Sequence, residues 1–120
     1  KHLKKALEGL AEEGVTQLFR PQIGSDFIVG AVGQLQFEVM ADRLANEYQL
    51  EVIFESSPYA EARWLTGERA EVEDFGNKHK TAMATDIDDQ PVFLAKSSWE
   101  IGYVAERYPK VGFERTKERG

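Results

Sequence analysis

The order of helix-like and strand-like segments is the feature that most constrains how this 120-residue chain folds. Apolar residues recur at helical spacing in four segments: residues 2–13, 34–48 and 68–80, and the stretch between Ser97 and Pro109. Short runs rich in β-branched and aromatic residues lie between these segments and predict strands. The predicted order is α-β-β-α-β followed by β-α-β-β-α-β. The second half has the complete order of an alpha-beta plait, and the first half has the same order without its first strand.

The predicted strands are bounded by turn residues such as Gly24–Asp26 and Asp88–Pro91. They cover residues 15–20, 27–32, 50–55, 60–65, 81–87, 92–96 and 111–115. Ser97 and Glu100 have the spacing of a capping box at the start of the last helix, and Pro109 ends that helix. We therefore expect an α+β fold, a two-layer ferredoxin-like arrangement (an alpha-beta plait) with antiparallel sheets and helices on one face.

The charge distribution argues against a general nucleic-acid binder. The chain carries a net charge of −6, and residues 15–105 alone carry −8. Neutralisation of phosphates drives nucleic-acid affinity, so an acidic domain binds nucleic acid poorly on its own. Residues 106–120 carry a net charge of +2 and fit either a solvated tail or a local face that touches RNA inside a larger assembly.

The sequence lacks the side-chain patterns of common catalytic, cofactor and metal sites. It contains no cysteine, and its two histidines, His2 and His79, are far apart. The run Asp86, Asp88 and Asp89 resembles a calcium loop only at its start, because the positions that need glycine and glutamate hold proline and serine. We therefore predict a solvated acidic hairpin there, and no catalytic, cofactor-binding or metal-binding residues in this chain.

Two glycines, Gly30 and Gly33, stand at a predicted strand-to-helix junction. Glycines at such a junction let the backbone approach a phosphate, or they make a tight turn with close helix–sheet packing. The dinucleotide and P-loop signatures are both absent, and this favours the tight turn.

The longest uncharged run, Phe27–Phe37, has 11 residues. A membrane-spanning helix needs about 20 residues, so we predict no membrane span.

Several segments are similar to those of translational GTPases. Gly30–Val39 resembles a segment in the third domain of elongation factor G. Four segments in order resemble the C-terminal domain of the peptide chain release factor three family: Gln17–Pro21, Gly30–Phe37, Ala62–Trp64 and Glu106–Pro109. The resemblance covers residues 3–118. It implies that residues 1–120 are a C-terminal domain fragment of a larger protein, with possible subunits 1–56 and 57–120 that share one core. The first residues, Lys1-His2 without a methionine, fit that expectation.

The resemblance also implies a function. The parent would be a cytoplasmic, ribosome-dependent GTPase that releases the codon-reading release factors at termination. GTP and Mg²⁺ would be bound by its N-terminal domain, so this fragment would need no cofactor and would not be an enzyme. Its partners would be the RNA and protein of the small ribosomal subunit and the other domains of the same factor. We expect a monomer that positions the GTPase domain. The alternative is a ferredoxin-like, small-molecule-binding regulatory module.

Phosphate contacts favour arginine and lysine, so the candidate ribosome-contact residues are mostly basic. They are Arg20, Arg63, Lys78, Lys80, Arg107, Tyr108 and Lys110. Arg107 and Tyr108 belong to one of the four matching segments. Tyr108 also continues the apolar stripe of the last helix, and this pattern favours a core residue. Arg20 and Arg63 are equally interpreted as partners in intramolecular salt bridges.

Overall fold

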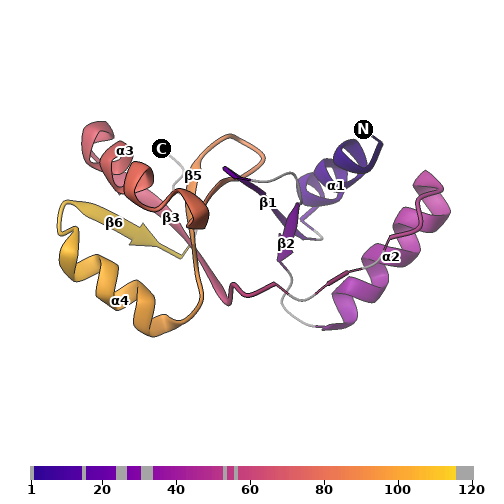
Figure 1. Ribbon diagram of the computed structural model, residues 1–120. Coiled ribbons are helices and arrows are strands. Elements are labelled where there is room, and N and C mark those ends of the chain that lie inside the picture. Colours follow the sequence, from indigo (N-terminus) through magenta and orange to yellow (C-terminus); the bar gives the residue numbers. More distant parts are fainter. Residues whose placement is uncertain are drawn as a thin grey trace.

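A single antiparallel sheet carries the fold. The computed structural model describes residues 2–14, 16–23, 27–30, 34–52, 54–55 and 57–115. The sheet has six strands in the order β2-β1-β4-β5-β3-β6. All of them except β4 are labelled in Figure 1. The strands are β1 (Gln17–Pro21), β2 (Ile28–Gly30), β3 (Glu61–Gly67), β4 (Met83–Thr85), β5 (Pro91–Ala95) and β6 (Val111–Glu114). The helices are α1 (His2–Glu12), α2 (Gln34–Tyr48), α3 (Arg69–Lys78), the short η1 (Lys80–Ala82) and α4 (Ser98–Arg107).

The C-terminal half is a complete plait. Its elements follow the order β3-α3-β4-β5-α4-β6, and its strands lie in the spatial order β4-β5-β3-β6 with every neighbouring pair antiparallel. This is the ferredoxin-like arrangement that the sequence predicts. The β1–β2 hairpin extends the same sheet through β4, although only two residue pairs, Arg20↔Thr85 and Pro21↔Ala84, join β1 to β4. The two halves therefore contribute to one sheet rather than two.

The helices α3 and α4 cover one face of this plait. Because side chains alternate along a strand, Leu65, Phe93 and Val111 all point to the same face. There they pack with Phe75 of α3 and Val104 of α4 in one buried cluster. The apolar stripes predicted for α3 and α4 are thus the sides of these helices that pack on the sheet.

The helices α1 and α2 form a second cluster with the β1–β2 hairpin. Leu10 of α1 and Leu44 of α2 are fully buried against Leu18 of β1. By the register of β1 with β4, Leu18 lies on the same side of the sheet as Met83. All four α-helices of the described residues therefore lie on one side, as predicted. In Figure 1, α1 and α2 stand at one end of the molecule and α3 and α4 at the other, in a body that measures 46 × 26 × 26 Å.

On the face of the sheet that carries no helices, side chains are buried because the sheet curls. Phe19, Trp64 and Val92 are buried there in a third cluster. β4 and β5 separate β1 from β3, so three strand spacings of about 5 Å each would keep Phe19 and Trp64 far apart in a flat sheet. Their ring centroids are only 5.8 Å apart. The sheet therefore curls so that β1 approaches β3 on this face.

The prediction of a strand at 50–55 is wrong for the described residues of this segment, 50–52 and 54–55, which form no strand. The helix α2 ends in a left-handed turn, in which Gln49 has a φ of 53° and Leu50 N donates to Leu44 O (2.9 Å). This turn sends the chain back along the helices, and the rings of Phe54 and Phe37 meet at 5.4 Å. The alternating apolar residues thus correctly predicted burial, but these residues pack against the cluster of α1, α2 and the β1–β2 hairpin instead of pairing as a strand.

Other element boundaries differ by a few residues. Residues 31–32 of the predicted strand 27–32 lie outside the described residues, as do Gly33 and the turn at 24–26. The predicted helix 68–80 ends at Lys78, and the predicted strand 81–87 begins only at Met83, because η1 takes the residues between them. At the start of α4, Ser97 Oγ accepts from Glu100 N (3.3 Å), which confirms the predicted cap. The Glu100 carboxylate accepts from Lys96 N (2.8 Å).

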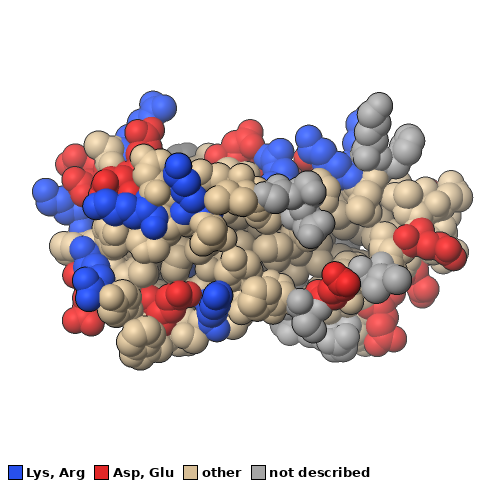
Figure 2. Space-filling view, in the orientation of Figure 1, with Lys and Arg blue, Asp and Glu red and all other residues tan. Residues whose placement is uncertain are grey.

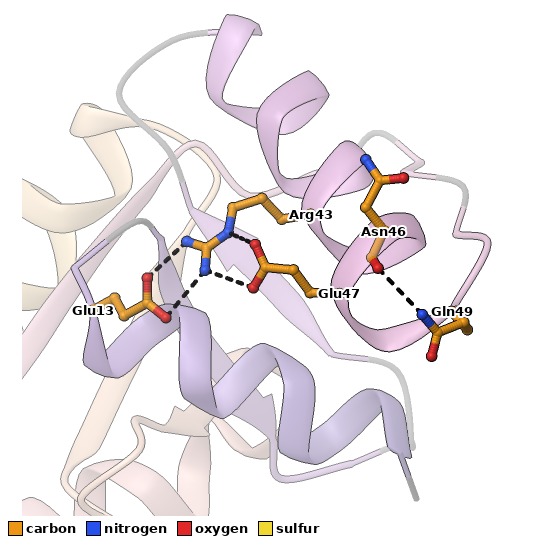
Figure 3. A network of polar contacts seen from close by, with 5 residues as sticks. All are labelled: Glu13, Arg43, Asn46, Glu47 and Gln49. Carbon is orange, nitrogen blue, oxygen red and sulfur yellow. Dashed lines mark hydrogen bonds and ion pairs between the residues drawn. The ribbon is translucent and has the colours of Figure 1, made fainter.

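An arginine joins the end of α1 to α2. Figure 3 shows the guanidinium of Arg43 between two carboxylates. It donates to Glu13 just beyond α1 (2.7 and 3.2 Å) and to Glu47 one turn further along α2 (2.7 and 2.9 Å). Hydrogen bonds from Arg43 hold the pKa of both carboxyl groups below the ordinary value of 4.5. Hydrogen bonds to Glu47 and then to Glu13 in turn raise the pKa of Arg43, so the guanidinium stays charged.

This clamp predicts a pH-dependent contribution to stability. A carboxyl group whose pKa is lower in the folded chain stabilises the fold above its unfolded pKa, and that contribution is lost as pH falls through the folded pKa. We expect Arg43→Met to lower the urea midpoint at about pH 7 and to lower it less at about pH 3, because the contribution of Glu13 and Glu47 is lost as pH falls through their lowered pKa values. Urea unfolding curves at both pH values measure this. An equal difference at both would contradict a role for charge in the clamp.

Candidate interaction surface

Two of the predicted contact residues, Arg63 and Tyr108, make their contacts inside the domain. The side chain of Arg63 is 12% exposed, and its Nη2 donates to Glu61 Oε1 at 2.6 Å. The hydroxyl of Ser98 at the start of α4 donates to the other oxygen of Glu61. Both bonds, that of Ser98 first, lower the pKa of Glu61. Arg63 is therefore a salt-bridge partner that ties β3 to this network, as the second interpretation expected.

Tyr108 lies against the core of the plait. Its ring meets Phe75 edge-on with the centroids 4.8 Å apart, and it also contacts His79 at 5.5 Å. The side chain is half-buried and packs on the cluster formed by α3, α4 and the sheet. It stands where the chain leaves α4, so the structure places it among the core residues rather than on an open face.

Arg20 and Lys78 are paired at the surface. Arg20 Nη2 lies 2.5 Å from Asp89 Oδ1 and also donates to the carbonyl of Asp86 at 3.4 Å. Lys78 Nζ lies 3.3 Å from Asp74 Oδ2, one turn earlier in α3. Exposed pairs of this kind contribute little to stability, so both cations stay accessible to a partner that offers a stronger contact.

The acidic hairpin is built around a buried carboxylate, which corrects the expectation of a wholly solvated loop. Asp86 is only 6% exposed. Its carboxylate accepts from Trp64 Nε1 and from the backbone N–H groups of Asp88 and Gln90, each at 2.9 Å. Asp88 and Asp89 are exposed, as predicted. Asp86 thus shapes the loop that Arg20 contacts, which is a structural role.

The other three candidates, Lys80, Arg107 and Lys110, are exposed. Arg107 differs from the two lysines because its guanidinium carbon lies 4.3 Å from the ring centroid of Tyr103, one turn earlier in α4. That position is a cation–π contact at the protein surface.

Sequence reasoning missed the aromatic residues that accompany Arg107. Trp99 is 73% exposed and Tyr103 is 42% exposed. Their rings are stacked, with centroids 5.2 Å apart and an interplanar angle of 21°. Trp99, Tyr103 and Arg107 are spaced four residues apart, so they form one row along the outer face of α4, which we call the α4 ladder. The sequence did contain a sign of this row, because Trp99 and Tyr103 do not lie on the apolar side of the helix that carries Ile101 and Val104.

In Figure 2, uncharged side chains form the lowest part of the lower left edge, over α4, and charged side chains of both signs lie on either side of them. Exposed apolar side chains that lie against one another, rather than singly, are typical of interaction surfaces. The α4 ladder is therefore the strongest candidate for an interaction surface among the described residues.

An open groove tests the alternative that the chain is a small-molecule-binding regulatory module. It encloses about 980 Å³ beside the β1–β2 hairpin and β3. Among its lining residues, Phe19 and Trp64 are apolar, while Glu61 and Asp86 make the internal hydrogen bonds described above. A ligand site needs polar groups aimed at the ligand, and these two carboxylates are used by the fold instead. The groove therefore adds no support to the alternative.

Two further properties concern the described part of the chain. No three His, Cys, Asp or Glu side chains there are grouped so that they could hold a metal ion. None of its helices has the length and apolar character that crossing a bilayer requires.

In a comparison with protein families, the family model described as Class II release factor RF3, C-terminal domain, matches residues 1–105 of the chain.

Proposed function

The chain belongs to the C-terminal domain family of class II release factor RF3, and from this membership we propose that it is the non-catalytic, ribosome-contacting domain of a termination GTPase. The match spans every element from α1 through most of α4. Membership places the chain in translation termination. The ribosome contact and its location on the domain are our proposal.

The exposed α4 ladder is the observation that carries the proposal. A domain that positions a neighbouring GTPase domain needs a stiff body and a surface that meets the ribosome. The continuous sheet with its helices on one side supplies the body, and Trp99, Tyr103 and Arg107 supply an exposed row of side chains. Among the predicted contact residues, Arg107 is the one that the structure joins to such a row.

The proposal extends to the larger factor. GTP and Mg²⁺ would be bound by another domain of the factor, and this domain would hold that GTPase domain in register on the small subunit while codon-reading release factors leave. The factor would act as a monomer in the cytoplasm. Lys80 and Lys110 remain candidates for contacts with phosphates, since both are exposed.

Co-sedimentation of the 120-residue chain with small ribosomal subunits, over a series of salt concentrations, tests the proposal. We expect salt-sensitive binding that Arg107→Ala weakens on the order of tenfold, because arginine truncations at interface centres commonly cost this much. Arg69→Ala is the matched control, since Arg69 is an exposed arginine on α3 with a partner, Glu73, in its own helix. Failure of the wild-type chain to bind at low salt would reject the proposal. Equal losses for both variants would reject the assignment to α4.

A further inference from the structure

We propose that the open edge of β2 pairs with one more β-strand, which is supplied by the segment of the larger factor that leads into α1. Residues 50–52 and 54–55, which follow α2, then pair with the other side of this strand. The inference goes beyond the proposed function, because it concerns how the domain is attached to the rest of the factor and not what it contacts on the ribosome.

The two halves of the described chain are built in the same way on either side of the β1–β4 pair. The hairpin β1–β2 corresponds to the hairpin β4–β5, since both are antiparallel and their first strands pair where the halves meet. One helix precedes and one follows each hairpin, namely α1 and α2 in one half and α3 and α4 in the other. β2 therefore corresponds to β5, and the segment after α2 corresponds to β6.

β2 lacks the second neighbour that β5 has. In the C-terminal half, β3 leads into α3 and pairs with β5 over four residue pairs. β5 thus has a strand on both sides, and four of its five residues are buried. Among the described residues, β2 is the last strand on the side of α1 and α2, and its three residues are only half-buried (Figure 1). A strand that leads into α1, at the place of β3, would cover this edge and pair its backbone groups.

The absence of this neighbour also leaves the segment after α2 without a strand to pair with. In the described chain, β6 pairs only with β3, so the counterpart of β6 needs a counterpart of β3. Leu50, Val52 and Phe54 have the period of two that a strand gives, and all three are half-buried against the cluster of α1, α2 and the hairpin. These residues therefore fit a strand whose partner is not in the chain.

The place of the added strand determines its chemistry. Alternate side chains would point toward the helices, where Val29, Phe37 and Val52 are half-buried, so these positions of the strand should be apolar. β3 ends at Gly67 and α3 begins at Arg69, so the strand should likewise end only a few residues before α1. It should run antiparallel to β2, as β3 runs antiparallel to β5. The occupant is thus an extended segment with alternating apolar residues, directly before α1 in the factor.

A strand in this place would anchor the domain to the part of the factor that precedes it. A flexible linker lets two domains turn independently, whereas a strand held by backbone hydrogen bonds fixes the direction in which the chain leaves the sheet. A rotation of the preceding domain would then be passed to the sheet. This attachment suits a domain that holds another domain in position.

Hydrogen–deuterium exchange of two chains tests the pairing, because amides in paired strands exchange slowly. One is the 120-residue chain, and the other is the same chain extended at its N-terminus by about 15 residues of the factor's own sequence, which is enough for one strand and its connections. We expect exchange at residues 27–30 and 50–55 to be slower by at least about tenfold in the extended chain and in the intact factor. Exchange at residues 91–95 should not change, since β5 already has both neighbours.

A matched pair of variants of the extended chain tests the role of the segment after α2. Val52→Asp places a charge on the half-buried side of the segment and should restore fast exchange at 50–55 while 27–30 stays protected. Glu51→Gln changes an exposed side chain and should keep both segments protected.

The outcomes are distinct from those of the ribosome-binding experiment, which is measured by co-sedimentation. Unchanged exchange at 27–30, or equal slowing at 91–95, would overturn the pairing of β2 with the added strand. Protection of 27–30 without 50–55 would overturn the part that concerns the segment after α2. Protection that is the same in both chains, together with a dimer in sedimentation velocity, would assign the edge to a second copy and would also overturn the inference.

Discussion

Replacing Phe75 with alanine is expected to lower the free energy of unfolding by about 4 kcal/mol, the usual cost of deleting a buried phenylalanine. The ring is fully buried at the centre of the plait. It lies 4.8 Å from the ring of Tyr108 and 5.3 Å from those of Phe93 and Phe113, so its loss leaves a cavity between α3, α4 and the sheet. Because total stabilities are about 5–15 kcal/mol, this variant should be close to unfolded at 37 °C.

Urea unfolding followed by far-ultraviolet circular dichroism measures the effect. Trp99→Ala is the control, because it also removes a large aromatic ring from the helical layer, but one that is exposed. An exposed substitution should change the free energy of unfolding by less than about 0.5 kcal/mol. If Phe75→Ala and Trp99→Ala were equally stable, the packing of α3 on the sheet would be wrong.

Local patterns were sufficient to predict the plait. The two helices α3 and α4 each have an apolar stripe that a core can use, and the Ser97 cap and Pro109 mark the ends of α4 in the sequence itself. The strand order follows once two β-α-β units must share one sheet. These features depend on residues near one another in the chain, which is why the sequence alone reveals them.

Long-range pairing was not predictable in the same way. Alternation at 50–55 indicates that one side of the segment is buried, but it does not say whether a strand or a helix buries it. The turn at Gln49 decides this, and it needs a left-handed glutamine that sequence patterns do not indicate. Likewise, no local signal shows that β1 pairs with β4 and thereby joins the two halves.

Site prediction by residue type confused two kinds of arginine. Arg63 follows Glu61 by two positions on a strand, so the two side chains share a face, and this spacing was available as a sign of an internal pair. Arg107 has tyrosine four positions before it, and Tyr103 has tryptophan four positions before it, a spacing that aligns all three on a helix. The spacing of an arginine from its neighbours on the predicted helix or strand was therefore a better guide to its role than its charge alone.

Replacing Asp86 with alanine is expected to lower the free energy of unfolding by about 3 kcal/mol, since hydrogen bonds to a buried charged group contribute about 1.5–3 kcal/mol and leaving their donors unpaired adds to the loss. The variant removes the acceptor of Trp64 Nε1 and of two backbone N–H groups. Asp89→Ala is the control, because it removes the exposed ion pair with Arg20 and none of these three bonds. Since Asp89 has a left-handed φ of 61°, alanine there adds backbone strain, and the variant should cost about 1–2 kcal/mol, less than Asp86→Ala.

The position of Asp86 predicts a second effect, on cooperativity. The loop that it shapes supports Arg20 of β1, and β1 joins β4 through only two residue pairs. When the loop loses its shape, this narrow joint should loosen, and the half that contains α1 and α2 should unfold before the plait. Trp64 reports on the joint, because its ring contacts Phe19 of β1.

Trp64 and Trp99 are the two tryptophans, so Trp99→Phe makes Trp64 the single fluorescent probe. In that background we expect the fluorescence and circular dichroism curves of Asp86→Ala to separate, while those of Asp89→Ala coincide. Coincident curves with the expected loss of stability would show that the two halves share one cooperative core even without the Asp86 bonds. A loss no larger than that of Asp89→Ala would mean that the buried carboxylate does not organise the loop.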